Sequence, residues 1–378
     1  MAILRPSGGD DYVALQAAID KGGTVEIPDP AAVFKCSRPL LYGSNTNLRI
    51  AAKILFDSPG VDWPNTYLMG PRANAGNGLR HANVTIDMSM GGQLIGLSDK
   101  TPTTLGGQHG LMLGFTDGFR IIEPTIIGDG NRNLFAINIR RSNNGVVTGG
   151  YVSHRTKWQG ADGFHVIGNS RDILIEGLAT ASGDDSSSQT LENSLNESNS
   201  VIERITYRNC LLRNFDHSSV KLLILPEVGD AAVIRDIRYE NCDMVTVPSF
   251  FGAGTPVWCV KNNPAQLVER VSIKGGRLRV SLPNPRQYVG GPLITLAGIK
   301  DFSLVDTDIE FFARQLVTAT DCPGLIFRPK SVQVYPGREV PPPSNATALV
   351  RLQRCAGAVI DTSKLAPVYP GQTIVSAT

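Results

Sequence analysis

The feature that most constrains this chain is a repeat of short strands. Runs rich in β-branched residues recur roughly every 22 to 40 residues, separated by Gly, Asn, Asp and Pro. Each repeat has a first strand such as ADGFHV (161–166), a second such as RITYRN, and usually a short third strand. The near-identical strings YRNC and YENC place Asn209 and Asn241 at the same turn of successive repeats. Three short strands per repeat without intervening helices exclude a TIM barrel or a Rossmann sheet, and they predict an all-β, right-handed parallel β-helix.

The N-terminal segment differs from the repeats. Residues 10–20, DDYVALQAAID, combine the candidate cap residues Asp10 and Asp11 with an apolar stripe, a pattern typical of a helix. Such a helix would cover the open first coil of a solenoid. We therefore expect an N-terminal cap over residues 1–30 and a single β-helix domain over 31–378. A length of 378 residues does not require several domains, because each repeat adds core.

Composition excludes several classes of protein. The net charge of +2 gives no strong field for nucleic acid, and no apolar run approaches the roughly 20 residues that span a bilayer. The first residues, MAILRPSGGDDYVAL, contain no apolar signal-peptide core, so we expect no classical signal peptide. A virion tail or an extracellular location would then be reached by another route, such as cell lysis. The six cysteines fit no metal-ligand spacing, and we expect neither a metal nor a cofactor.

Acidic residues gather where three consecutive first strands begin. Equivalent residues of adjacent coils lie roughly 4.8 Å apart in a parallel solenoid, so residues distant in sequence form columns. We align the first strands on positions taken as inward, among them Ser186, Ser188 and Trp258. The alignment then yields an aspartate column and a neighbouring one: Asp162, Asp184 and Asp216, followed by Asp185 with His217.

Basic and aromatic residues lie further along the same predicted face. Arg140, Gln189, Lys221 and Lys261 share an outward column, and His165 points outward between them. Stacked carboxylates cannot all ionise easily, which supplies a protonated acid beside an ionised base. Glycoside hydrolysis requires that pair. Basic side chains could hold an acidic or heavily hydroxylated sugar, and the loop residue Trp158 could form a wall of the sugar site.

The order of these motifs resembles a known family. ADGFH, SGDD, a His-containing strand and a strand ending in Lys resemble the polygalacturonase-type glycoside hydrolases of the pectin-lyase-like superfamily. That family carries Asn-Thr-Asp, Gly-Asp-Asp, Gly-His-Gly and Arg-Ile-Lys on consecutive coils. The resemblance in repeat pattern covers most of the chain, whereas the motif match is partial. His217 lacks both flanking glycines, and Cys259 stands at the Arg position, which puts galacturonate specificity in doubt.

The resemblance implies roles for individual residues. Asp184 matches the general acid, and Asp162 with Asp185 matches the pair that activates water in an inverting mechanism. His217 and Lys261 match substrate-binding positions. We add Lys221, His165, Trp158 and Asp216 as substrate-binding candidates from their predicted columns and loops.

Bacteriophage tailspikes that degrade capsular or O-antigen polysaccharides have similar β-helices. We therefore expect an endo-acting hydrolase of a bacterial surface or acidic polysaccharide, of the tailspike depolymerase type. Tailspikes are commonly trimers, so a homotrimer is one expectation, although no coiled-coil segment is present. Two alternatives remain open. One is a polysaccharide lyase, with the aspartates binding Ca²⁺ and Lys221 or Lys261 as the base. The other is a tail protein or adhesin that binds glycan without cleaving it.

Overall fold

The fold is a right-handed parallel β-helix preceded by one short α-helix, as the repeats predict. The computed structural model describes residues 4–57, 67–72, 79–97, 108–129, 134–154, 161–192, 200–215, 217–247, 255–281, 292–311, 315–334 and 348–378. The chain divides into two compact units, an N-terminal unit (Met1–Asp184) and a C-terminal unit (Asp185–Thr378). Each unit contains three parallel sheets, named A, B and C, and each coil contributes one strand to each sheet. The division of residues 1–30 and 31–378 into a cap and one domain stays a prediction.

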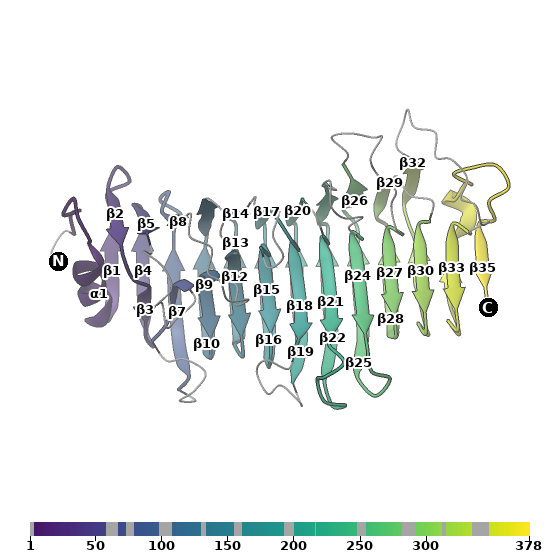
Figure 1. Cartoon of the computed structure of the whole chain (residues 1–378), viewed down its shortest axis with the longest axis horizontal. Helices are drawn as coiled ribbons and strands as arrows, with labels where there is room; N and C mark the ends of the chain where they lie inside the picture. Colours follow the sequence, from purple (N-terminus) through teal and green to yellow (C-terminus); the bar gives the residue numbers. More distant parts are fainter. Residues whose placement is uncertain are drawn as a thin grey trace. The chain divides into compact units, whose positions relative to one another are not determined.

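In the N-terminal unit the strands of each sheet follow one another in chain order, beginning beside α1 (Tyr12–Asp20) (Figure 1). Sheet A consists of β1 (Gly23–Ile27), β4 (Thr46–Ile50), β7 (His81–Asp87), β10 (Thr116–Ile122), β13 (Asn143–Thr148) and β16 (Ser170–Glu176). Sheet B consists of β2 (Val33–Cys36), β5 (Lys53–Asp57), β8 (Gln93–Leu97), β11 (Thr125–Asp129), β14 (Tyr151–His154) and β17 (Ala179–Ser182). Sheet C consists of β3 (Leu40–Tyr42), β6 (Tyr67–Pro71), β9 (Gln108–Gly114), β12 (Leu134–Arg140) and β15 (Phe164–Ile167).

The C-terminal unit repeats the same arrangement. Sheet A consists of β19 (Val201–Arg208), β22 (Val233–Glu240), β25 (Leu267–Lys274), β28 (Ile299–Val305), β31 (Ile326–Arg328) and β34 (Val359–Ile360). Sheet B consists of β20 (Leu211–Asn214), β23 (Asp243–Thr246), β26 (Arg277–Val280), β29 (Asp308–Phe311) and β32 (Ser331–Val334). Sheet C consists of β18 (Ser187–Leu191), β21 (Val220–Ile224), β24 (Val257–Lys261), β27 (Ile294–Ala297), β30 (Val317–Thr320), β33 (Val350–Gln353) and β35 (Val375–Ala377). One 3₁₀ turn, η2 (Thr362–Lys364), precedes β35.

The cap helix begins two residues later than predicted. Asp11 makes no capping hydrogen bond; its carboxylate instead accepts the backbone N–H groups of Ser7 (2.6 Å) and Lys35 (2.9 Å). Asp10 accepts the N–H of Tyr12 at 3.1 Å. The two aspartates therefore fasten α1 to the strand that contains Lys35, which is how the helix is held over the first coil. The helix is the longest among the described residues, and none of these helices has the length and apolar character for crossing a bilayer.

Stacked aliphatic side chains fill the interior of the N-terminal unit. One register column of sheet A contains five residues that are fully buried: Leu48, Ile86, Ile121, Val147 and Ile175. Burying one such side chain contributes roughly 1.5–3 kcal/mol. The strands alternate between these inward residues and outward polar ones, so the period-two pattern of the sequence and the observed sheets agree.

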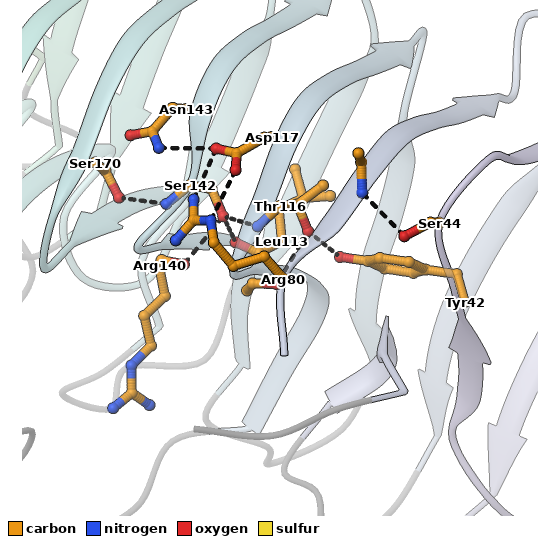
Figure 2. A network of polar contacts seen from close by, with 12 residues as sticks. Tyr42, Ser44, Arg80, Leu113, Thr116, Asp117, Arg140, Ser142, Asn143 and Ser170 are labelled. Atoms are coloured by element: carbon orange, nitrogen blue, oxygen red, sulfur yellow. Dashed lines mark hydrogen bonds and ion pairs between the residues drawn. The ribbon is translucent and has the colours of Figure 1, made fainter. Parts of the chain in front are cut away.

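The corner between sheets C and A of this unit is built from buried hydroxyls (Figure 2). Ser142 Oγ donates to the carbonyl of Leu113 (2.8 Å) and accepts the N–H of Thr116 (2.8 Å), while Ser170 Oγ accepts the N–H of Ser142 (3.2 Å). Hydroxyl groups thus satisfy backbone groups that the sharp bend leaves outside the strand ladders. Figure 2 also shows the side chain of Arg140 directed away from this corner.

The interior of the C-terminal unit contains a polar network where β18 meets sheet A. Tyr207 and Tyr239 stack with ring centroids 4.8 Å apart. Gln189 joins them, because its amide donates to the Tyr207 hydroxyl (2.6 Å) and accepts from Tyr239 (2.9 Å). Ser187 Oγ lies 3.0 Å from the Tyr239 hydroxyl. The polar residues of β18 are therefore compatible with a core because their partners are buried beside them.

The predicted asparagine turn is confirmed. Asn209 and Asn241 directly follow β19 and β22, and both have left-handed backbone, with φ of 52° and 53°. Asparagine adopts this conformation more readily than most residues, which explains why it recurs there. The next coil has Gly275 and Gly276 at this turn, with φ of 67° at both.

Candidate functional site

The centre of the candidate site in the C-terminal unit is a buried ion pair. Asp185 is completely buried, and its Oδ2 accepts a hydrogen bond from the ammonium of Lys221 at 2.7 Å. Its Oδ1 accepts the backbone N–H of Ser218 at 3.0 Å. Lys221 lies in β21 between the buried residues Val220 and Leu222, so its side chain points outward from sheet C. The ion pair therefore lies on the outer face of this sheet.

His217 is the nearest imidazole to this ion pair in the C-terminal unit. One of its ring nitrogens lies within 4.8 Å of a carboxylate oxygen of Asp185. Together the two side chains offer donor atoms of the kinds that bind metals. The Lys221 ammonium also lies beside Asp185 and balances the negative charge of its carboxylate.

The N-terminal unit contains two further predicted carboxylates. Asp162 is buried, and its Oδ2 lies 3.0 Å from Nδ1 of His165, an ion pair when the imidazole is protonated. The backbone N–H of Asp184 donates to the carbonyl of Ala161 at 3.3 Å, which places Asp184 one coil beyond Asp162. The side chain of Asp184 is also buried. Asp184 and Asp185 are consecutive in the chain.

Residues that the sequence alone did not single out surround His165. Phe135 lies between two imidazoles, stacked on His109 with centroids 5.2 Å apart and edge-on to His165 at 4.9 Å. Burial, together with the charges of His165 and Arg140, lowers the pKa of His109 to about 3. His109 is therefore neutral above that pH.

Asn138 is the second unforeseen polar residue of this face. It pairs in register with His165, and both side chains are buried. Within the described part of the chain, Asn138 Oδ1 has no hydrogen-bond partner. A buried amide that pairs in register with a candidate histidine is a signal that the alignment of these two strands could have supplied.

One predicted substrate-binding residue, Lys261, is not brought to the ion pair. The ammonium of Lys261 donates to the carbonyls of Pro264 (2.9 Å) and Gln266 (2.7 Å). Lys261 also lies three residues beyond Trp258, the register partner of Lys221, and three residues span roughly 10 Å along a strand. Burial lowers the pKa of Lys261. Its role in binding substrate stays a prediction, and the structure shows it stabilising a turn. Trp158 and Asp216 lie outside the described residues.

The predicted strand register is wrong in sheet C of the C-terminal unit. Ser188 pairs with Lys221, and Lys221 pairs with Trp258, so these three side chains form the outward column. Gln189, predicted to point outward, pairs with Leu222 and lies in the core. Trp258, predicted to point inward, is half-buried and lies 5.7 Å from the Lys221 ammonium, measured to its ring centroid. A register shift by an odd number of residues reverses every side chain of a strand, which accounts for both errors.

Comparison with known proteins identifies the fold. No protein-family model matches the sequence, and no curated protein sequence matches it either. Among solved structures, the chain is similar to the tailspike protein of E. coli bacteriophage HK620 in complex with a hexasaccharide, at 13% identity and a TM-score of 0.63. That match covers 99% of this chain and 75% of the tailspike. The same tailspike in complex with a pentasaccharide matches at 13% identity and a TM-score of 0.65, over 93% and 68% of the two chains.

A bacterial surface protein has a similar structure. The adhesin PfbA of Streptococcus pneumoniae matches at 11% identity and a TM-score of 0.60, over 100% of this chain and 95% of the adhesin. At these identities the matches show the fold alone. They confirm the right-handed parallel β-helix fold, and they leave the polygalacturonase-type assignment as a resemblance.

Proposed function

We propose that this chain hydrolyses a bacterial surface or acidic polysaccharide on the outer face of sheet C. The observation that carries the proposal is the ion pair of Asp185 and Lys221. Burying two charges costs several kcal/mol per ion before their attraction compensates, and apolar residues of similar volume would often stabilise the fold as well. A buried charge pair on an otherwise regular strand face therefore indicates a functional site.

The neighbouring carboxylates give this proposal its chemistry. Glycoside hydrolysis needs one carboxyl group that protonates the leaving oxygen and one carboxylate that activates water. Asp184 is the candidate acid, as its motif implies, and Asp162 with Asp185 are the candidates for positioning water. Lys221 and Ser218 both donate hydrogen bonds to Asp185, and two donors suit a carboxylate base better than a protonated acid. His217 and His165 are candidates for binding sugar hydroxyls.

The structural neighbours support the choice of substrate. The HK620 tailspike was solved with bound oligosaccharides, and it has the same fold as this chain. A tailspike-type depolymerase in a virion tail, or a protein acting outside the cell, is consistent with that likeness. A homotrimer is part of the same proposal.

A second candidate is glycan binding without cleavage. The adhesin neighbours have the same fold. One observation favours this candidate, namely that both carboxylate oxygens of Asp185 already accept hydrogen bonds from within the protein. A water-activating role would require water to reach a remaining lone pair of this completely buried carboxylate when substrate binds.

Replacing Asp184 tests the hydrolase proposal. The full chain is incubated with a panel of bacterial capsular polysaccharides, O-antigens and polygalacturonate, and new reducing ends are counted. Wild type should release reducing ends from at least one polymer, and Asp184→Asn should reduce the rate by roughly 10²-fold or more, the usual contribution of a general acid. The exposed Glu227 gives a matched charge-removing control, Glu227→Gln, which should cleave as wild type does.

The outcomes separate the two candidates. Full activity in Asp184→Asn overturns the assignment of the acid. No cleavage of any polymer by wild type, together with measurable glycan affinity, establishes the binding protein instead.

A further inference from the structure

One outward column of sheet C in the C-terminal unit runs without interruption over five strands. The register pairs are Lys221 with Trp258, Trp258 with Thr295, Thr295 with Thr318, and Thr318 with Arg351. Their strands, β21, β24, β27, β30 and β33, lie side by side in Figure 1. Four strand spacings amount to roughly 19 Å, enough for several sugar rings. We call the last four of these residues the Trp258 strip.

Trp258 provides an aromatic surface on this column. Its neighbours Val257 and Cys259 are completely buried, so the alternation of the strand places the indole on the outer face. The indole is half-buried, and the Lys221 ammonium lies 5.7 Å from its ring centroid. A large apolar ring in this position can stack on the C–H face of a sugar, while the indole N–H remains a donor.

Small hydroxylated side chains continue the strip beyond Trp258. Thr295 and Thr318 are both partly exposed, and the adjacent outward column carries Ala297 and Thr320. Thr318 Oγ1 is itself buried and has no hydrogen-bond partner in the described residues. A buried hydroxyl without a partner is costly for a protein, and this independent observation points to a ligand that supplies the missing bond.

The strip ends on a positive charge. Arg351 is exposed, and among the described residues it has no carboxylate within ion-pair distance. The guanidinium is a planar fork that binds carboxylates in a bidentate manner. The described members of the column contain no acidic residue, so the strip favours an anionic ligand.

We propose that the Trp258 strip is a subsite for a carboxylated polysaccharide. Trp258 stacks on one sugar ring, Thr295 and Thr318 bond to sugar hydroxyls, and Arg351 pairs with a sugar carboxylate. The chain of sugars thus runs across the strands, away from the ion pair of Asp185. This inference rests on the proposed glycan specificity of the face, and it holds whether or not the glycan is cleaved.

The test measures binding of the full chain to an array of neutral and carboxylated bacterial surface oligosaccharides and oligogalacturonates. Wild type should bind at least one carboxylated glycan, and Trp258→Ala should weaken that affinity by about tenfold or more. Trp258→Phe keeps an aromatic ring and should therefore retain most of the wild-type affinity. Tyr151→Ala removes another partly exposed aromatic residue, in the N-terminal unit, and should bind as wild type does.

The role of the positive charge of Arg351 is tested separately. Arg351→Gln should weaken binding of the carboxylated glycan, and it should have no effect once the glycan carboxyl groups are reduced to alcohols. Arg120→Gln is the control, because Arg120 is an exposed arginine of sheet A in the N-terminal unit. If folded Trp258→Ala binds with unchanged affinity, or if wild type binds only neutral glycans, the Trp258 strip is not a subsite for a carboxylated polysaccharide. Either result leaves the proposed function intact. Failure of wild type to bind any glycan overturns both.

Discussion

At the residue scale, Asp185 and Lys221 are the most informative pair. Asp185 has no exposed surface and Lys221 has 17% of its side-chain surface exposed, yet their charged atoms lie 2.7 Å apart. The attraction within the pair compensates for a large desolvation cost, so each partner depends on the other. The same residues are the ones whose motif and strand position drew attention in the sequence.

Removing only the lysine should therefore be strongly destabilising. In Lys221→Met the buried carboxylate of Asp185 loses its counter-charge, and we expect the free energy of unfolding to fall by about 3–5 kcal/mol. The control is Lys330→Met, because the pair of Lys330 and Asp308 is exposed and such pairs contribute about 0–1 kcal/mol. Urea denaturation followed by circular dichroism measures both. An equal decrease in the free energy of unfolding in both variants would show that the buried pair contributes no more to stability than the exposed pair.

His109 should make stability depend on pH. Its pKa in the folded state is about 3, mainly because burial disfavours the charged ring, whereas an unfolded histidine has a pKa of about 6.5. Between these values the unfolded state binds the additional proton, so stability is lost as pH falls from about 6.5 towards 3.

The variant His109→Gln isolates this contribution. Its free energy of unfolding, measured by denaturation at pH 7 and pH 5, should fall less on acidification than that of wild type. Other titrating groups affect both proteins alike and cancel in the comparison. The same decrease in both proteins would contradict the role of His109.

Sequence reasoning could nominate charged candidate residues more readily than aromatic ones. Asp162, Asp184, Asp185, His217 and Lys221 could be chosen because charge is conspicuous in a strand and the motif order supported it. Trp258 could not, because an aromatic residue suits either face of a strand and its neighbours Val257 and Val260 do not decide between them. Aligning Lys221 with Lys261 placed Trp258 inward, whereas the observed register pairs Lys221 with Trp258 and places the indole outward.

At the element scale, adjacent coils can stack closely only where a small residue lies beside a large buried one. Gly145 of β13 pairs in register with Phe119 of β10, and a Cβ at Gly145 would lie 1.8 Å from the Phe119 ring. The ring of Phe119 is 1% exposed and has no room to move away. This glycine is therefore required by packing, not by backbone conformation.

Gly145→Ala should destabilise the protein by about 1–3 kcal/mol or more, the usual cost of overpacking a core. Gly43→Ala is the matched control, because a Cβ there would meet nothing within 4 Å. That control should be neutral or slightly stabilising. Thermal unfolding of the two variants gives the comparison, and a neutral Gly145→Ala would contradict the close contact with Phe119.

The strand pattern predicted the elements well and their register poorly. Three strands per coil, the left-handed asparagines and the cap helix follow from local patterns that the sequence displays directly. The register of β18 does not, because Ser187 and Gln189 are as polar as the outward residues beside them. Their inward position depends on Tyr207 and Tyr239, which are distant in sequence, and only the tertiary structure reveals those partners.

At the scale of the whole molecule, the fold is established more firmly than the activity. Repetition along the sequence predicted the parallel β-helix, and solved tailspike and adhesin structures at 11–13% identity share it. The same fold carries both oligosaccharide-bound tailspikes and a surface adhesin, so fold alone cannot choose between cleavage and binding. That choice depends on the carboxylates around Asp184 and Asp185.

The most direct test of the central claim is the mass of the products formed in water enriched in ¹⁸O. Wild type is incubated with the panel of bacterial capsules, O-antigens and polygalacturonate, and the fragments are weighed by mass spectrometry. Hydrolysis predicts one added water per cut, which carries one ¹⁸O, and a decrease of roughly 10²-fold or more in the rate of fragment formation by Asp184→Asn. Unsaturated fragments without ¹⁸O, lost on addition of a chelator, would instead establish a lyase and contradict the account.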